Sequence, residues 1–127
     1  MNLEKVIFAF FIVLALTLNF GFFLGEIENP GHHNIYELFA AIVINLIATI
    51  MKLGDRSHIG SVLLATSLVA DLHLVAAAIV WAFAAHIISS GLTADMMSTI
   101  VSLSGGALLA NLISVVLFVS ETVVIRR

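Results

Sequence analysis

The sequence has no cysteine, which excludes disulfide bonds and thiol chemistry from any account of this protein. Charged residues make up only 10% of its 127 residues, whereas 61% are hydrophobic. A soluble domain of this length needs many more charges to cover its surface. The formal net charge of −3 comes with no run of basic residues, so nucleic-acid binding has no support. The composition is that of a membrane protein.

Four apolar runs are each long enough to cross a bilayer, which needs about 20 helical residues. We expect the helices to cover approximately residues 6–24, 35–53, 59–88 and 97–122. None of the runs alternates apolar and polar residues in the manner of a membrane β-barrel. The sequence therefore predicts an all-α integral membrane protein in which residues 1–127 form a single domain of four transmembrane helices with short loops.

The basic residues indicate the orientation. All five lie on the same side of the predicted spans: Lys5, Lys52, Arg56, Arg126 and Arg127. The connections 25–34 and 89–95 contain neither lysine nor arginine. By the positive-inside rule both termini are cytoplasmic, and we expect a bacterial inner (plasma) membrane protein. Ser57 and Thr93 are expected to cap the third and fourth helices.

Asp71 is the most informative residue, because it lies near the centre of the third apolar run. An aspartate there costs roughly 2.5–3.5 kcal/mol on insertion scales, so such residues usually mark functional sites. Counting 1.5 Å per residue places Asn45 and Asn111 at about the same depth. Their oxygens suit a small cation or a proton. Alternatively, these groups only hydrogen-bond between helices and hold the bundle together.

The second run carries polar and small residues along one helical face: Glu37, Ala41, Asn45, Ala48, Thr49 and Lys52. Such a face either lines a path for ions or packs against neighbouring helices. His73 lies about 160° from Asp71 around the third helix, and we interpret it as a neutral, hydrogen-bonded imidazole. The ion or proton path is assigned to Asp71, Asn45, Asn111, Glu37, Thr49 and Thr66.

The fourth run has a small residue at every fourth position: Ser98, Ser102, Gly106, Ala110 and Ser114. This spacing predicts a close helix interface, formed by Ser102, Gly106, Ala110 and Ser114, either within the chain or with another copy. Four helices enclose little space, so a conducting path forms more naturally between several copies. We therefore expect a homo-oligomer.

No metal site or cofactor is predicted. Candidate metal ligands are confined to the ends of the helices and one loop: His32, His33, Glu37 and His86. The sequence offers no recognisable pairing of nucleophile and base, so we do not expect an enzyme.

Two functions stay open. The first is a homo-oligomeric ion channel or ion-coupled transporter with a mid-membrane polar site for a cation or proton. The alternative is a non-catalytic accessory or scaffold subunit of a larger membrane complex. The expected partners are the lipid bilayer, further copies of the chain, and a small cation or proton.

Overall fold

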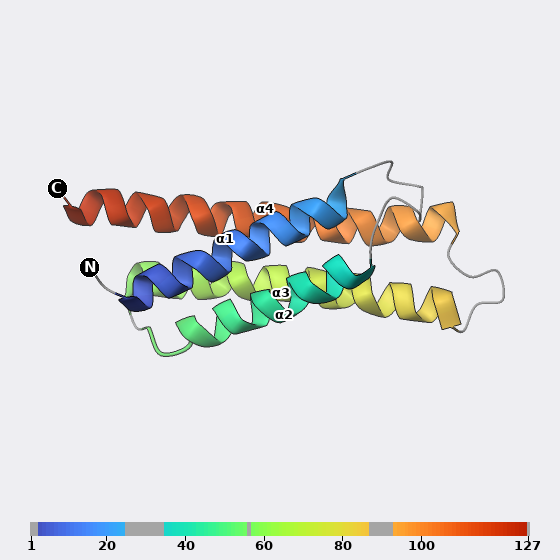
Figure 1. Cartoon of the computed structure of the whole chain (residues 1–127), viewed down its shortest axis with the longest axis horizontal. Coiled ribbons are helices and arrows are strands. Elements are labelled where there is room, and N and C mark those ends of the chain that lie inside the picture. The colour runs from blue at the N-terminus through green and yellow to red at the C-terminus, as the bar shows by residue number, and fades with distance from the viewer. Residues whose placement is uncertain (1–2, 25–34, 56, 87–92, 127) are drawn as a thin grey trace.

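The computed structural model describes residues 3–24, 35–55, 57–86 and 93–126. These residues form four helices, which Figure 1 shows as a bundle: α1 (Leu3–Phe23), α2 (Ile35–Lys52), α3 (His58–His86) and α4 (Ala94–Arg126). Each is long and apolar enough to cross a membrane. The all-helical fold with four such helices is therefore confirmed.

The helix ends follow capping groups more closely than hydropathy. The Thr93 Oγ1 accepts a hydrogen bond from the Met96 amide at 3.2 Å, so α4 begins at Ala94 and not at residue 97 as predicted. α1 also begins earlier than predicted, at Leu3, with Glu4 in its first turn, where the helix dipole favours an acidic side chain. α4 continues to Arg126, beyond the predicted residue 122. Residues 87 and 88, predicted as helical, lie outside the described residues.

The turn between α2 and α3 is held by side-chain hydrogen bonds. Ser57 Oγ accepts from the Gly60 amide at 3.0 Å and so caps α3, as predicted. Asp55 Oδ1 accepts from the Ser57 hydroxyl at 2.7 Å and from the Ser57 amide at 2.9 Å. These bonds hold the pKa of the Asp55 carboxyl below its usual value. Asp55 and Ser57, on either side of residue 56, are therefore held by hydrogen bonds.

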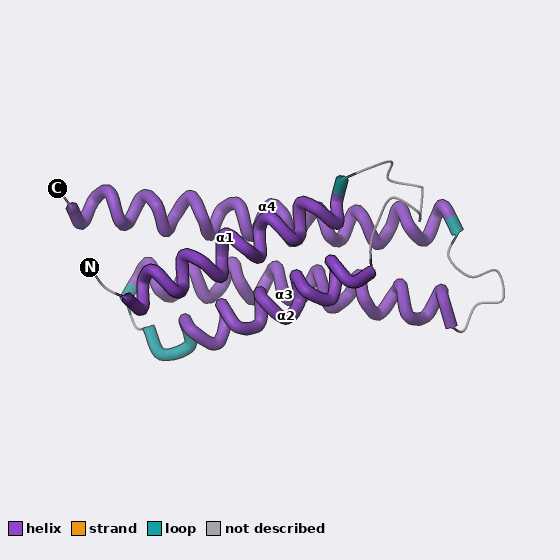
Figure 2. Tube along the Cα trace, in the orientation of Figure 1, coloured by secondary structure: helices purple, strands orange, loops and turns teal. Residues whose placement is uncertain are grey.

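The helices run up and down, and neighbours in sequence are neighbours in space (Figures 1 and 2). α1 packs against α2, α2 against α3 and α3 against α4, while α1 also contacts α4 and closes the ring. Both chain ends lie at the same end of the bundle as the α2–α3 turn (Figure 1). We call this the turn end, and the opposite end, where α1 stops and α2 starts, the loop end.

The buried interior consists of two apolar clusters. The larger, here the loop-end cluster, contains Phe22, Leu38, Leu74, Met97 and Ile100 among others. The smaller, here the turn-end cluster, contains Phe8, Ile12, Ala48, Leu63 and Phe118. Between them along α2, α3 and α4 lies a layer of buried polar residues: Asn45, Thr49, Ser67, Asp71, Asn111 and Ser114. The polar layer thus lies between two apolar clusters, which we call the seals.

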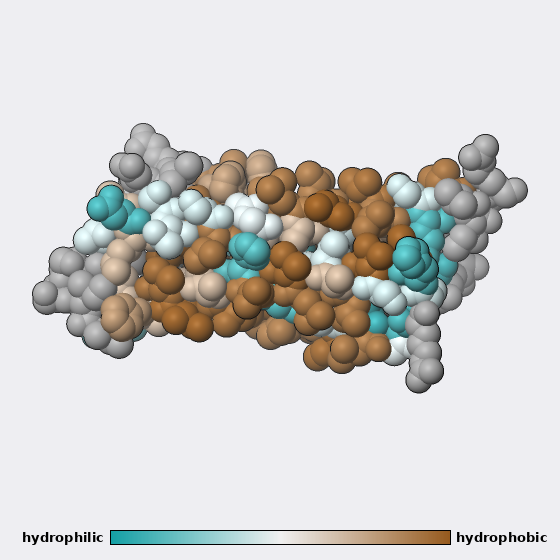
Figure 3. Space-filling view, turned by 180° about the vertical axis from the view of Figure 1, so that it is seen from behind, coloured by the Kyte–Doolittle hydropathy of each residue, from teal (hydrophilic) through white to brown (hydrophobic). Residues whose placement is uncertain are grey.

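The outer surface is apolar along every helix. Large hydrophobic side chains such as Phe10, Ile50, Leu72 and Leu109 are between 61% and 69% exposed. Figure 3 shows apolar side chains over most of the middle of one face, with hydrophilic residues gathered toward both ends. A surface of this kind matches a hydrocarbon environment and supports a membrane protein.

Candidate functional site

Asp71 faces the bundle interior. Asp71 is only 8% exposed, whereas the adjacent Leu72 is 69% exposed and faces outward. The side chain of Thr49 on α2 meets it, with Thr49 Oγ1 2.6 Å from Asp71 Oδ2. Side chains on helices lean toward the helix N-terminus, so Asp71 on α3 and Thr49 on the antiparallel α2 lean toward one another. The result is a buried hydrogen bond between two helices.

The Thr49 hydroxyl has more acceptors around it than hydrogens to give. Its Oγ1 also lies 2.8 Å from the main-chain oxygen of Asn45, one turn earlier on α2. A hydroxyl has one hydrogen, so it donates fully to one of these oxygens or shares that hydrogen between them. Both contacts are hydrogen bonds when Asp71 carries a proton on Oδ2 and donates it to Thr49, which donates to Asn45. The geometry therefore accommodates a protonated carboxyl.

The second carboxyl oxygen, Asp71 Oδ1, is buried and has no hydrogen-bond partner among the described residues. Leaving a buried acceptor unpaired costs about 1–3 kcal/mol. Asp71 Oδ1 is thus the unpaired oxygen of this contact among the described residues.

Asn45 is linked to Asp71 and Thr49 through its backbone, and we call these three residues the Asp71 cluster. Its main-chain oxygen accepts from Thr49, while its side-chain Nδ2 donates to the Ala41 carbonyl at 2.9 Å. Asn45 is buried, with 1% of its surface exposed. Of the predicted path residues, Asp71, Thr49 and Asn45 are therefore brought together.

Asn111 and Thr66 lie at the α3–α4 contact. The Thr66 and Ser114 hydroxyls hydrogen-bond to each other across the two helices. Counting from that contact along α3 and α4 places Asn111 within about one turn of the depth of Asp71, as expected. Asn111 is 4% exposed, yet among the described residues no side-chain hydrogen bond joins it to Asp71. Both residues are neighbours of the cluster and are not bonded to it.

Glu37 lies apart from the cluster, in the first turn of α2. Its carboxylate occupies the space where a side chain at Gly21 of α1 would lie. The buried Leu38 and Ala41 separate it from Asn45, at a distance of about 12 Å along the helix. The predicted face of α2 thus turns inward and packs against other helices over its central part.

The small residues of α4 contact more than one surface. A Cβ at Gly106 would lie 2.5 Å from His73 Cδ2 on α3, so the missing side chain makes room for this imidazole. Ser114 also faces α3, and Ala110 is buried in the loop-end cluster. Ser102 is exposed on the bundle surface. At Gly106 and Ser114 the neighbouring helix is α3 of the same chain.

His73 lies on the opposite side of α3 from Asp71. Its Nδ1 is 2.9 Å from the Val69 carbonyl oxygen, one turn earlier on the helix. A carbonyl accepts only, so Nδ1 carries a hydrogen and Nε2 faces Gly106 on α4. The two side chains make no contact with one another.

Sequence reasoning missed one polar pair, Asn19 on α1 and Ser104 on α4, both 0% exposed. Their side chains are 2.9 Å apart. With the Asn19 amide turned by 180°, its nitrogen donates to Ser104 and its oxygen accepts from the Leu108 amide at 2.9 Å. An asparagine within an apolar run is itself the signal that would have identified this contact. The pair is satisfied and joins α1 to α4.

The candidate metal ligands do not form one group. His32 and His33 lie outside the described residues, while His86 is exposed at the end of α3. Within the described ranges, no group of three or more histidine and acidic side chains could hold a metal ion.

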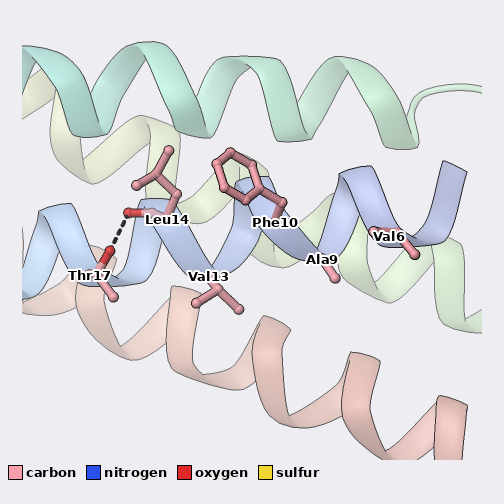
Figure 4. A pocket seen from close by; sticks show the side chains of 6 residues that line it. All are labelled: Val6, Ala9, Phe10, Val13, Leu14 and Thr17. Atoms are coloured by element: carbon pink, nitrogen blue, oxygen red, sulfur yellow. Dashed lines mark hydrogen bonds between the residues drawn. The ribbon is translucent and has the colours of Figure 1, made fainter. Parts of the chain in front are cut away.

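A shallow hollow runs along α1 (Figure 4). It is lined by Val6, Ala9, Phe10, Val13, Leu14 and Thr17. Its one polar side chain, Thr17, donates to the Leu14 carbonyl at 2.9 Å within the same helix. The hollow is therefore apolar and is separate from the Asp71 cluster.

No curated protein and no solved structure shows significant similarity to the chain. The family comparison does give a match, which covers α2, α3 and most of α4 and includes Asp71, Thr49 and Asn45. Residues 32–122 match a family of unknown function, DUF6394, and the chain belongs to that family.

Proposed function

We propose that this chain is a proton-coupled membrane transport protein in which Asp71 binds and releases the proton. The observation that carries the proposal is the Asp71–Thr49 contact. The Thr49 hydroxyl faces two acceptors with one hydrogen, and Asp71 Oδ1 is buried without a hydrogen-bond partner among the residues that the structure describes. Both features fit a carboxyl that takes up and releases a proton.

A proton fits this site better than a metal cation. Calcium takes six to eight oxygen ligands and magnesium about six, and both need several oxygens free to turn toward the ion. Among the described residues, the side-chain oxygen hydrogen-bonded to Asp71 is that of Thr49, which is already engaged with Asn45. A proton needs one lone pair on the carboxyl and removes its charge from the apolar interior.

The two apolar clusters fit a site that is closed to both ends at once. The loop-end cluster seals one side and the turn-end cluster the other, with members no more than 8% exposed. Transport then requires each seal to loosen in turn, so that the proton enters from one side and leaves to the other. We infer a plasma-membrane protein with both termini cytoplasmic, from the basic residues at the turn end.

The site lies inside one bundle, so proton binding itself requires no second copy. Assembly into a homo-oligomer stays a prediction and would serve stability or regulation. A scaffold subunit of a larger membrane complex is the second candidate. The satisfied Asn19–Ser104 and Thr66–Ser114 contacts favour it, because they are of the kind that only join helices.

Flux through reconstituted protein tests the proposal. Proteoliposomes are given a pH gradient or a potassium diffusion potential, and internal pH is followed with a trapped dye. We expect the parent to move protons and Asp71→Asn to lose most of this flux. Asp95→Asn is the matched control, because Asp95 is exposed in the first turn of α4. Flux no greater than in empty vesicles would favour the scaffold, and equal flux above that level in the parent and Asp71→Asn would refute Asp71 as the proton site.

A further inference from the structure

Asp71 lies near the middle of α3, 13 residues or about 20 Å from His58, but its carboxyl meets α2 near the turn end of that shorter helix. Its partner Thr49 is in the last turn of α2, three residues before Lys52, a rise of about 4.5 Å. On α3, Ser67 lies one turn from Asp71 in the same direction and is 3% exposed. Polar groups therefore continue from the site toward this end.

The opposite direction is filled by the apolar side chains of the loop-end cluster. The loop-end cluster includes Leu38 and Ala41 on α2 and Leu74 and Ala77 on α3, all 0% exposed. The polar Asn19–Ser104 pair on that side is buried, and its groups are engaged with α4. An ion leaving Asp71 toward the loop end meets several turns of packed apolar side chains.

The turn-end side is closed by two aromatic rings. Phe8 of α1 and Phe118 of α4 are 1% and 8% exposed, and their ring centroids are 5.4 Å apart. The two rings pack in one cluster with Ala48, the residue next to Thr49. The Lys52 ammonium lies 4.2 Å from the Phe8 ring centroid and 3.4 Å from Asp55 Oδ2. Phe8 thus contacts both the charged end of the bundle and the seal beside the site.

We propose that water reaches the Asp71 carboxyl from the turn end of the bundle. The rings of Phe8 and Phe118 form a plug that closes this water route in the present structure. The cation–π contact and the ion pair of Lys52 hold the plug shut from outside. The proposal rests on the proposed function only in naming the proton as the species that uses this route. That this end is the one that opens to water is a separate claim with its own test.

The absence of cysteine gives a clean background for that test. Ser67→Cys introduces a thiol one turn from Asp71 on the plug side, and Ala77→Cys introduces one in the loop-end cluster. Each protein is placed in lipid nanodiscs, where both ends meet solvent, and reacted with a small water-soluble methanethiosulfonate. The rate is compared before and after Phe8→Ala. Phe22→Ala is the matched control, because Phe22 is 0% exposed in the loop-end cluster and contacts Trp81.

We expect Phe8→Ala to raise the labelling rate of the Ser67→Cys thiol by about tenfold or more, because the lost ring leaves a gap that water can enter. Phe22→Ala should leave that rate within about twofold, and the Ala77→Cys thiol should stay slow with Phe8→Ala. Phe118→Leu, which keeps an apolar side chain but loses the ring contact, is the second variant if Phe8→Ala does not fold.

Equal acceleration by Phe8→Ala and Phe22→Ala, or none in folded plug variants, would overturn the proposed route. Labelling reports water access and does not depend on proton transfer. If Asp71→Asn leaves proton flux intact while Phe8→Ala still opens Ser67→Cys, the proposed function fails and the plug stands. If Asp71→Asn loses proton flux but Phe8→Ala does not change the labelling of Ser67→Cys, the proposed function stands and the plug fails.

Discussion

Replacing Thr49 by valine tests the contact on which the site depends. Valine keeps the branched shape of threonine but has no hydroxyl, so the Asp71 carboxyl loses the one side-chain hydrogen bond that the structure gives it. Thr49→Ser keeps the hydroxyl and removes a methyl group, which costs about 0.8 kcal/mol if fully buried. Thr17→Val is the matched control, because the Thr17 hydroxyl bonds only within α1.

The quantity to measure is the coupling free energy between Thr49→Val and Asp71→Ala in a double-mutant cycle. The loss of the Thr49–Asn45 contact occurs in both backgrounds and cancels. Neutral hydrogen bonds between membrane helices contribute about 0.6 kcal/mol on average and at most about 1.7 kcal/mol. A bond to an ionised carboxylate is roughly twice as strong. For a protonated Asp71 we therefore expect a coupling of about 1 kcal/mol.

Equilibrium unfolding in mixed micelles with increasing dodecyl sulfate, followed by circular dichroism, gives the four free energies of the cycle. A coupling below about 0.3 kcal/mol would mean that the two side chains do not interact, which refutes the site geometry. A coupling of about 2 kcal/mol or more, above the neutral maximum of about 1.7 kcal/mol, would indicate an ionised carboxylate and contradict the hydrogen assignment.

Three further predictions concern packing, the turn and topology. Gly106→Ala should destabilise the protein by about 1–3 kcal/mol because its Cβ would lie 2.5 Å from His73, and His73→Ala should remove most of that cost. Gly54→Ala, which meets no atom within 4 Å, should change stability much less. The pKa of Asp55 is lowered from 3.8, so its stabilising contribution is present above that pH and lost as pH falls below it; Asp55→Asn should remove this acid dependence in an unfolding titration. Reporter fusions after residue 127 should indicate a cytoplasmic C-terminus, and an external one would overturn the predicted orientation.

The helices were predictable because lipid imposes a simple length and composition. A run of about 20 apolar residues leaves few alternatives to a helix, and all four runs became helices. Their ends depend on local hydrogen bonds that hydropathy does not measure. Thr93 illustrates this, because recognising it as a cap places the start of α4 correctly while the apolar run starts three residues late.

The site was predictable only in part, since depth follows from counting residues but rotation about each helix axis does not. Asp71 and Thr49 were both named from sequence, yet their pairing requires that α2 and α3 turn these faces toward one another. Thr66 looked equivalent and instead bonds to Ser114 on α4. The unpartnered Asp71 Oδ1 depends on every surrounding rotamer, and no sequence pattern encodes that.

The central claim is that Asp71 holds a proton, and infrared spectroscopy measures this directly. A protonated carboxyl has a carbonyl stretching band that an ionised carboxylate lacks, and the band shifts when H₂O is replaced by D₂O. At neutral pH we expect this band in the parent protein, its loss in Asp71→Asn, and its retention in the exposed control Asp95→Asn. A parent spectrum without the band, or an unchanged band in Asp71→Asn, would contradict the account.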